Sequence, residues 1–254
     1  MKFESDRQQK RLKNKKRSRN AISFIILFVF LAGIAAALFI ITTINRQMSI
    51  NAASLREFDL NDIPEFADAP YVEINKNTPW FDKEQKSSRQ AFEEYSELDL
   101  LGRCGSAMAN VCPELMPAGE RTEIGMIKPS GWHTVRYDDI IEDRYLYNRC
   151  HLIAYALTGE NANEKNLITG TRYMNVSGML PFEIRVANYI RETGNHVLYR
   201  VTPVFSGNES VARGVIMEAW SVEDRGMGIC FNVFCYNVQP GIEIDYSTGE
   251  SHRK

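Results

Sequence analysis

An uncharged apolar run at residues 21–44 constrains this chain more than any other feature. Its 24 residues are rich in Ile, Leu, Phe and Ala and contain no Asp, Glu, Lys or Arg. About 20 apolar residues let a helix cross a bilayer, so the run predicts a single transmembrane anchor. A cleaved signal peptide is the alternative, because the small residues from Ala32 to Ala37 resemble a cleavage region. The run is longer than the roughly 7–15 apolar residues of a signal core, which favours the anchor.

The charges around the run predict its orientation. Residues 1–20 hold nine Lys or Arg against Glu4 and Asp6, a local charge of +7. Basic residues beside a span tend to stay in the cytoplasm, so we expect a cytoplasmic tail at 1–20 and the bulk of the chain outside the cell membrane. Anionic lipid headgroups are the expected partners of this basic tail, rather than nucleic acid.

The rest of the chain has the composition of a folded protein. Apolar residues make up 44% of the 254 residues and charged residues 24%, which excludes bulk disorder and leaves room for one sizeable domain. Residues 45–70 are largely polar and contain Pro64 and Pro70, so they are interpreted as a linker or stalk. We expect the folded domain at residues 71–250.

Strand patterns dominate the last quarter of the chain. The stretches 196–205, 211–220 and 228–238 are rich in β-branched and aromatic residues, with Gly207 and Asn208 as a turn between the first two. Residues 181–192 instead place apolar side chains at helical spacing, with Pro181 in the first turn. The predicted fold class is therefore α+β, with a central antiparallel sheet.

The densest group of chemically useful residues lies at 147–190. It contains His151, Arg149 two residues earlier, several Asn and three Glu. A neutral imidazole with a pKa near roughly 6.5 suits a general base, although a lone His is more often a structural hydrogen-bonding group. Asn residues in such turns commonly cap helices. The residues alone leave catalysis and a structural role equally open.

The order of these residues resembles a known family. Asn148-Arg149-Cys150-His151-Leu152, then residues 166–172, Asn175 and Glu183 are similar to the DNA/RNA non-specific endonucleases of the ββα-metal superfamily, in the branch of the streptococcal DNA-entry nuclease and streptodornases. Residues 101–132 and 232–241 also resemble that branch, so the likeness extends over roughly residues 70–250. The usual motif there is Asp-Arg-Gly-His, from which Asn148 and Cys150 depart.

The resemblance implies a ββα-metal nuclease core and a role for each matching residue. It implies that His151 is the general base, that Asn175 binds Mg²⁺ directly, with Mn²⁺ as an alternative, and that Glu183 holds water bound to the metal. Asn166 would position the site, and Arg149 would bind phosphate or stabilise the transition state. Arg172 and Arg185 are the candidate substrate-binding residues. Where the family has a basic residue one turn after the Glu, this chain has Ala187.

The implied substrate is DNA, with RNA as a second candidate, cut without sequence readout; no obligate protein partner is indicated. The charge outside the tail is −9, because the whole chain carries −2, and this argues against nucleic-acid binding. A local cluster of four residues is expected to form a positive cleft despite that balance: Arg149, Lys165, Arg172 and Arg185.

Two rival interpretations remain. A catalytically inactive relative that binds nucleic acid or a partner is disfavoured because His151, Asn175 and Glu183 are all present. A thiol hydrolase with Cys150 as nucleophile is disfavoured because adjacent residues of a strand point to opposite sides.

Five cysteines, at 104, 112, 150, 230 and 235, suit disulfide formation in an exported domain, and their odd number leaves at least one unpaired within the chain. Cys230 and Cys235 cannot pair within one unbroken strand, where they would lie about 16 Å apart. We expect Cys104 to pair with Cys112, with cross-links from that loop to the late strand as the alternative. Cys150 replaces a family glycine beside His151 and is expected to stay reduced. The spacing of cysteines and histidines gives no support for a structural zinc site.

Overall fold

The computed structural model describes residues 32–36, 38–39, 60–119 and 121–254. Residues 32–36 and 38–39 are helical, and the remainder of the predicted span 21–44 lies outside the described residues. Within the described ranges, no helix is long and apolar enough to cross a membrane. The predicted basic tail and most of the predicted linker also lie outside these ranges.

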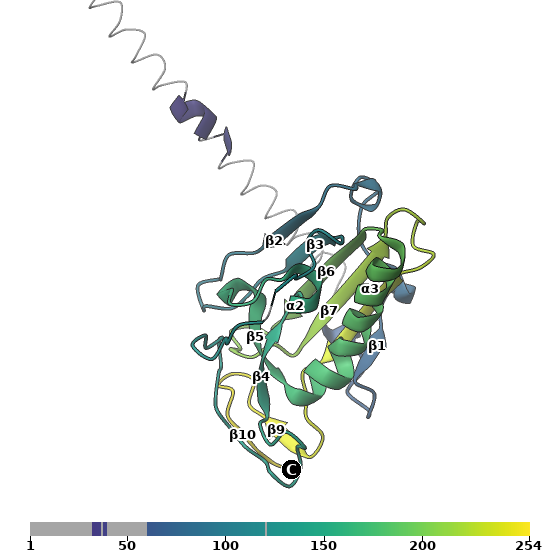
Figure 1. The fold of residues 1–254 in the computed structure, drawn as a ribbon. Coiled ribbons are helices and arrows are strands. Elements are labelled where there is room, and N and C mark those ends of the chain that lie inside the picture. Colours follow the sequence, from purple (N-terminus) through teal and green to yellow (C-terminus); the bar gives the residue numbers. More distant parts are fainter. Residues whose placement is uncertain (1–31, 37, 40–59, 120) are drawn as a thin grey trace, which may run out of the picture. The chain divides into compact units, whose positions relative to one another are not determined.

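The folded unit is built on a six-stranded antiparallel sheet in the order β1-β8-β7-β6-β3-β2 (Figure 1). Its strands are β1 (Tyr71–Glu73), β2 (Phe92–Tyr95), β3 (Ala107–Val111), β6 (Val197–Val204), β7 (Gly214–Ser221) and β8 (Cys230–Tyr236). The three long strands at its centre are the three that the β-branched and aromatic stretches predicted. This confirms the predicted α+β class with a central antiparallel sheet.

Two smaller sheets and three helical segments complete the unit. The strand pairs are β4 (Tyr147–His151) with β5 (Leu167–Thr171), and β9 (Ile242–Ile244) with β10 (Ser251–Arg253). The helices are α2 (Tyr155–Thr158), the π-helix η5 (Met174–Met179) and α3 (Leu180–Thr193). Short 3-10 turns lie at Leu60–Asp62, Asn75–Asn77, Gln85–Ser87 and Glu164–Asn166.

The predicted helix at 181–192 is confirmed as α3. Pro181 lies in its first turn, where a missing backbone N–H costs no hydrogen bond. The helix ends at Gly194, whose positive φ of 69° allows its N–H to bond to the carbonyl of Ile190. Val186, Ala187 and Ile190 face inward and are buried. The apolar stripe of α3 therefore covers one face of the large sheet (Figure 1).

The opposite face of the sheet is covered by the chain that precedes β2. Leu60, Ile63 and Phe66 pack into an apolar cluster with residues of β7 and β8. The hydroxyl of Tyr236 also donates a hydrogen bond to the carbonyl of Pro64 over 2.8 Å. The folded unit thus extends back at least to Leu60. The expected boundary at residue 71 is wrong, since polar composition concealed the few apolar anchors of residues 60–70.

All five cysteines are free thiols, which agrees with only part of the prediction. Cys230 and Cys235 lie in the single strand β8 and do not pair, as expected. The predicted bond between Cys104 and Cys112 is wrong, because the extended strand β3 lies between them. The Cys104 thiol instead donates to the carbonyls of Glu164 and Leu167, each over 3.2 Å.

Candidate active site

The candidate site is built from β4, β5 and the helical segment that follows them. The two strands are antiparallel, with His151 opposite Leu167 and Asn148 opposite Gly170. A side chain at Gly170 would collide with Cys150, whose Cβ would lie 2.7 Å from the added carbon. Glycine therefore permits the close approach of the two strands. The arrangement of two strands and a helix is the ββα core that the resemblance implied.

His151 ends β4 and is held at both ring nitrogens. Its Nε2 lies 2.9 Å from the backbone carbonyl of Asn161, and its Nδ1 lies 3.2 Å from a guanidinium nitrogen of Arg121. A carbonyl only accepts and a guanidinium only donates, so these partners select the neutral tautomer with the proton on Nε2. The lone pair that a general base needs is consequently on Nδ1, under Arg121.

Burial keeps the His151 imidazole neutral. The side chain is 7% exposed, and burial, together with the nearby charge of Arg121, lowers its pKa from 6.5 to about 4. The hydrogen bond to the Asn161 carbonyl acts in the opposite direction and is outweighed. The ring is therefore in its proton-accepting form over the whole physiological pH range.

Asn166 is a positioning residue. Its side chain is fully buried, with Oδ1 accepting from the Ile153 N–H over 2.8 Å and Nδ2 donating to the Ile153 carbonyl over 2.9 Å. The Asn166 carbonyl also accepts from the Leu152 N–H. These bonds fix the chain just after His151 against the start of β5. Asn166 thus contacts the backbone that follows His151, which is consistent with the positioning role that the resemblance implied.

Asn175 lies in η5 and faces β4. Its Oδ1 accepts a hydrogen bond from the Cys150 thiol over 3.0 Å, and its Nδ2 lies 3.5 Å from Oδ1 of Asn148. Asn148 and Cys150, the two residues that depart from the usual family motif, thus both contact Asn175, the proposed metal ligand. Burial raises the pKa of the Cys150 thiol, which is 1% exposed. A buried, protonated thiol is a poor nucleophile, which removes the main support for the thiol hydrolase.

The oxygen donors of this region fit a hard divalent cation. Burial raises the pKa of the Glu183 carboxyl to about 8, against the opposing effect of the nearby Arg121 charge. An amide oxygen at Asn175 and this carboxyl on the next helix are ligands of the kind Mg²⁺ prefers. The part of the chain that the structure describes has no cluster of three or more His, Cys, Asp or Glu side chains able to hold a metal.

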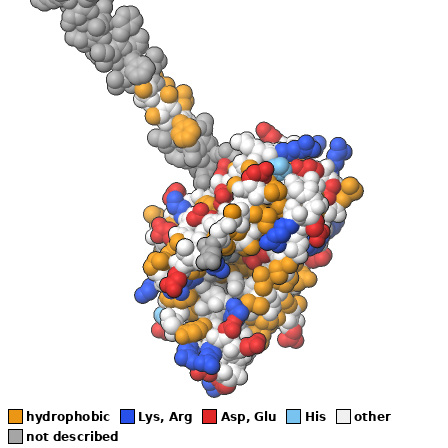
Figure 2. All heavy atoms as spheres, in the orientation of Figure 1, with side chains coloured by type: hydrophobic (Ala, Val, Ile, Leu, Met, Phe, Trp, Pro, Cys, Tyr) orange, Lys and Arg blue, Asp and Glu red, His pale blue; other side chains and the backbone are white. Residues whose placement is uncertain are grey.

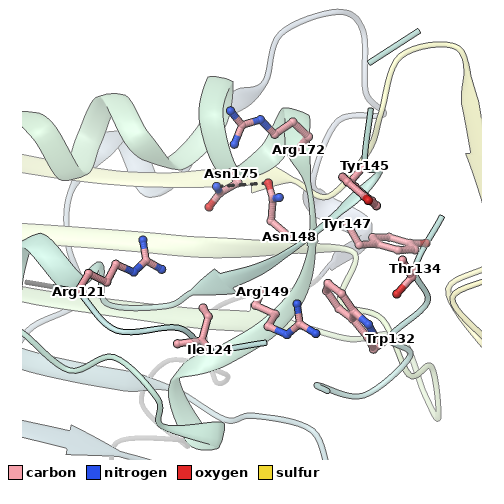
Figure 3. A pocket seen from close by; sticks show the side chains of 10 residues that line it. All are labelled: Arg121, Ile124, Trp132, Thr134, Tyr145, Tyr147, Asn148, Arg149, Arg172 and Asn175. Atoms are coloured by element: carbon pink, nitrogen blue, oxygen red, sulfur yellow. Dashed lines mark hydrogen bonds between the residues drawn. The ribbon is translucent and has the colours of Figure 1, made fainter. Parts of the chain in front are cut away.

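A cavity of about 550 Å³ opens beside Asn175 (Figure 3). His151 does not line it, but the Arg121 side chain that contacts His151 does. Three of its lining residues are arginines and none is acidic, although the chain outside the tail is acidic. Its lining residues are Arg121, Ile124, Trp132, Thr134, Tyr145, Tyr147, Asn148, Arg149, Arg172 and Asn175.

The predicted basic cluster is only half assembled at this cavity. Arg149 and Arg172 line it, with Arg172 also paired to Asp143. Lys165 instead pairs with Glu97 over 2.6 Å, and Arg185 donates to the carbonyl of Gly228. Residues two apart on a helix point about 200° apart, so Arg185 lies on the face of α3 opposite Glu183. Arg185 therefore does not line this cavity, and its substrate-binding role stays a prediction.

Charge elsewhere on the visible surface is mixed. Figure 2 shows Lys, Arg, Asp and Glu side chains interspersed over the face in view, with no broad basic area. The three arginines that line the cavity supply positive charge locally, although the chain outside the tail is acidic overall.

Sequence reasoning missed Arg121 and Asn161. Asn161 contacts the His151 ring through its carbonyl, while its side chain contacts Arg121 over 3.2 Å and donates to the Thr122 carbonyl over 2.8 Å. One residue thus contacts both His151 and Arg121. No pattern signalled this, because Arg121 lies 30 positions from His151 in a segment with no regular structure.

Comparison with known proteins defines the class. The sequence model described as DNA/RNA non-specific endonuclease matches residues 83–223, which include every element of the ββα unit. The chain belongs to the DNA/RNA non-specific endonuclease family.

Individual relatives agree with this assignment. The chain is 34% identical over 110 residues to a deoxyribonuclease of Streptococcus dysgalactiae subsp. equisimilis, a match that covers 41% of this chain and spans about a third (32%) of that relative. Its fold is similar to NucA from Streptococcus agalactiae with a magnesium ion bound, with a TM-score of 0.65, 23% identity, and coverage of 83% and 95% of the two chains. Sda1 nuclease with a bound zinc ion is also similar, with a TM-score of 0.62, 24% identity, and coverage of 78% and 100%.

Proposed function

We propose that this protein is a metal-dependent, sequence-nonspecific endonuclease that hydrolyses phosphodiester bonds of DNA, with RNA as a second substrate. One observation carries the proposal: His151 is held as a neutral ring whose Nε2 proton is committed to the Asn161 carbonyl, which leaves Nδ1 as the acceptor. A ring held in this way is oriented before substrate arrives, which is what general-base catalysis requires.

In this mechanism Nδ1 of His151 accepts a proton from the water that attacks phosphorus. Arg121 must first leave Nδ1, and a phosphate in the cavity is the natural new partner for its guanidinium. Binding of the substrate would then release the base and neutralise phosphate charge in one movement. Asn166 keeps the backbone of His151 in place throughout.

Asn175 and Glu183 are the residues proposed to hold Mg²⁺, with Mn²⁺ as an alternative. When bound, the ion supplies positive charge to the phosphate and to the departing oxygen. Support comes from the oxygen donors described above and from the metal-bound structures of two proteins with a similar fold, NucA with magnesium and Sda1 with zinc.

We further propose that the nuclease domain works outside the cell, on a single-pass anchor at residues 21–44 with a cytoplasmic N-terminus. The uncharged run and the preceding basic tail support this placement. Protease treatment of intact cells that express the chain with an epitope at each end tests it. Loss of the C-terminal epitope alone is expected, and protection of both epitopes would contradict it.

The activity is tested with the purified full-length chain in detergent. Supercoiled plasmid DNA and structured RNA are incubated with Mg²⁺, and again with excess EDTA. We expect nicked and then linear DNA with Mg²⁺ and intact DNA with EDTA. Absence of cleavage by a folded chain, with binding of DNA preserved, would instead support the inactive binding relative.

A further inference from the structure

The cavity has one aromatic wall, which the mechanism above does not use. Trp132, Tyr145 and Tyr147 gather on the side away from Arg121, with Asn148 and Asn175 between the two sides (Figure 3). Tyr147 and Trp132 pack into the apolar cluster around Leu146 and Ile242, whereas Tyr145 is 45% exposed. Tyr145 is thus the ring of this wall that is most open to a ligand.

The wall is held in place by its neighbours. The Arg149 guanidinium lies 4.1 Å from the centre of the Trp132 ring, and it is itself fixed by donating to the carbonyls of Ile127 and Gly125, the latter over 2.8 Å. The Tyr147 hydroxyl donates to the Gly249 carbonyl over 2.9 Å. These contacts hold Trp132 and Tyr147, and the Arg136 guanidinium lies 5.5 Å from the centre of the Tyr145 ring. Stacking a ligand on rings that are already supported would require little ordering.

The geometry also gives Arg149 a second role. Two of its five guanidinium N–H groups donate to carbonyls, and its flat face lies against Trp132 as part of the wall. Arg149 thus supports the aromatic surface in addition to its predicted role in phosphate binding. Arg121 and Arg172 are the other two lining cations.

We propose that this aromatic wall, centred on Tyr145 and Trp132, stacks the base of an unpaired nucleotide next to the phosphodiester that is cut. This inference rests on the proposed nuclease function and names its preferred substrate as single-stranded or locally opened nucleic acid. A cavity of about 550 Å³ is within the range of roughly 300–1,000 Å³ that small-molecule sites occupy. Arginines beside aromatic rings are the combination by which proteins bind single strands without reading sequence.

Duplex nucleic acid does not offer this contact, because each base is already stacked on both faces. Stacking on a protein ring requires that one nucleotide leave the helix, which is least costly in single strands and at mismatches. Every base has a flat π face, so the contact is indifferent to sequence. The wall would therefore favour unpaired nucleotides over duplex without favouring any sequence.

Binding in EDTA tests the wall apart from catalysis. The intrinsic tryptophan fluorescence of the full-length chain in detergent is titrated with a 15-mer of thymidine, a 15-mer of abasic deoxyribose phosphates and a blunt 15-base-pair duplex. We expect quenching and tighter binding with the thymidine 15-mer alone. The substitution Tyr145→Leu should weaken that binding about 5- to 150-fold and leave binding of the abasic strand unchanged. Tyr145→Phe, which keeps the ring, is the matched control and should bind like the wild type.

Cleavage mapping supplies the second arm. A labelled single strand with one abasic position is digested with Mg²⁺, and we expect a gap in the cleavage ladder at one fixed offset from that position. The gap should be absent with Tyr145→Leu. A ladder without a gap, or equal binding of the thymidine and abasic strands, overturns the proposal. If binding depends on the bases but no strand is cut, the wall stands and the proposed nuclease activity fails.

Discussion

Two groups of buried polar residues in this protein differ in whether a ligand can reach them. At the candidate site, His151 and Asn166 are partnered by backbone groups of nearby segments, and Arg121 separates the base from an open cavity. On the other side of the large sheet, Arg200 of β6 and Glu218 of β7 form an ion pair with no exposure at all. The first grouping stays within reach of a ligand and the second does not.

The buried pair is sealed by the chain before β2. Glu218 accepts from Nε of Arg200 over 2.7 Å and from the Trp80 N–H over 2.7 Å, and the Arg200 guanidinium lies 5.0 Å from the centre of the Phe81 ring. Strand alternation places Tyr199 and Val201 in the core under α3, so Arg200 points to the opposite face. Burial alone therefore does not mark a functional residue, and the two groupings differ in that an arginine of the first lines a cavity.

The substitution His151→Ala should break the site and leave the sheet intact. We expect a fall in cleavage rate on the order of 10²–10⁴, because removal of a positioned base typically costs that much. The thermal unfolding midpoint should stay near that of the wild type. Rates on plasmid DNA, measured beside circular dichroism melting, check this. Cleavage at the wild-type rate would remove His151 from the mechanism.

Glu218→Ala should lower the stability of the protein and leave its cleavage activity unchanged. Loss of one partner leaves the Arg200 charge buried without compensation, which typically costs about 3–5 kcal/mol of unfolding free energy. Urea denaturation of the two proteins measures the loss. Below the transition, the specific activity of the folded variant should match the wild type. A stable variant with reduced activity would show that the ion pair serves the site.

Asn175→Ala and Glu183→Gln sharpen the comparison at the proposed metal. Loss of the Asn175 amide oxygen should lower activity severely and raise the Mg²⁺ concentration needed. Glu183→Gln should have the milder effect of a residue that orients ligands, about 10- to 100-fold in metal affinity. Activity is titrated with Mg²⁺ for each variant. Curves that coincide with the wild type would exclude both residues from the metal site.

Asn166→Ala should lower both the unfolding free energy and the cleavage rate, because Asn166 holds the backbone next to His151. Two buried hydrogen bonds to Ile153 are lost, at a cost of about 1–3 kcal/mol for each backbone group left without a partner. Cleavage should also fall as His151 loses its fixed position. Denaturant titration and rates at saturating Mg²⁺ separate the two effects. Full activity in a destabilised variant would reduce Asn166 to a purely structural role.

The smallest expected effect is a shift in pH dependence. Because the pKa of His151 is about 4 in the free protein, the base stays unprotonated well below pH 6.5. The acid limb of kcat/KM should then fall nearer pH 4 than pH 6.5. Arg121→Met removes a charge that lowers this pKa and should move the limb upward. A limb at pH 6.5 in both proteins would contradict the burial of the base.

The unfolding free energy should also depend on pH through His151, and it should fall as the pH falls. The unfolded chain takes up a proton at His151 near pH 6.5, whereas the folded chain does so near pH 4. The contribution of the neutral ring to stability is therefore fully present above pH 6.5 and is lost as the pH falls towards 4. In His151→Ala this part of the pH dependence of unfolding should disappear.

The sequence by itself determined the main elements of the fold. The strands around Val201, Met217 and Phe234 and the helix from Leu180 to Thr193 were predictable, because β-branched runs and helical spacing are local properties. The order of His151, Asn166, Asn175 and Glu183 along the chain was also sufficient to indicate the family.

Tertiary structure decided what surrounds those residues. Arg121 reaches His151 across 30 positions, and Arg185 turns away from the cavity although it lies two residues from Glu183. Residues 60–70 belong to the folded unit through a few apolar contacts, and β3 separates Cys104 from Cys112. Each outcome depends on contacts between distant segments or on which face of an element a side chain occupies. Local sequence patterns predict helices and strands, but the packing of these elements against one another determines which side chains come into contact.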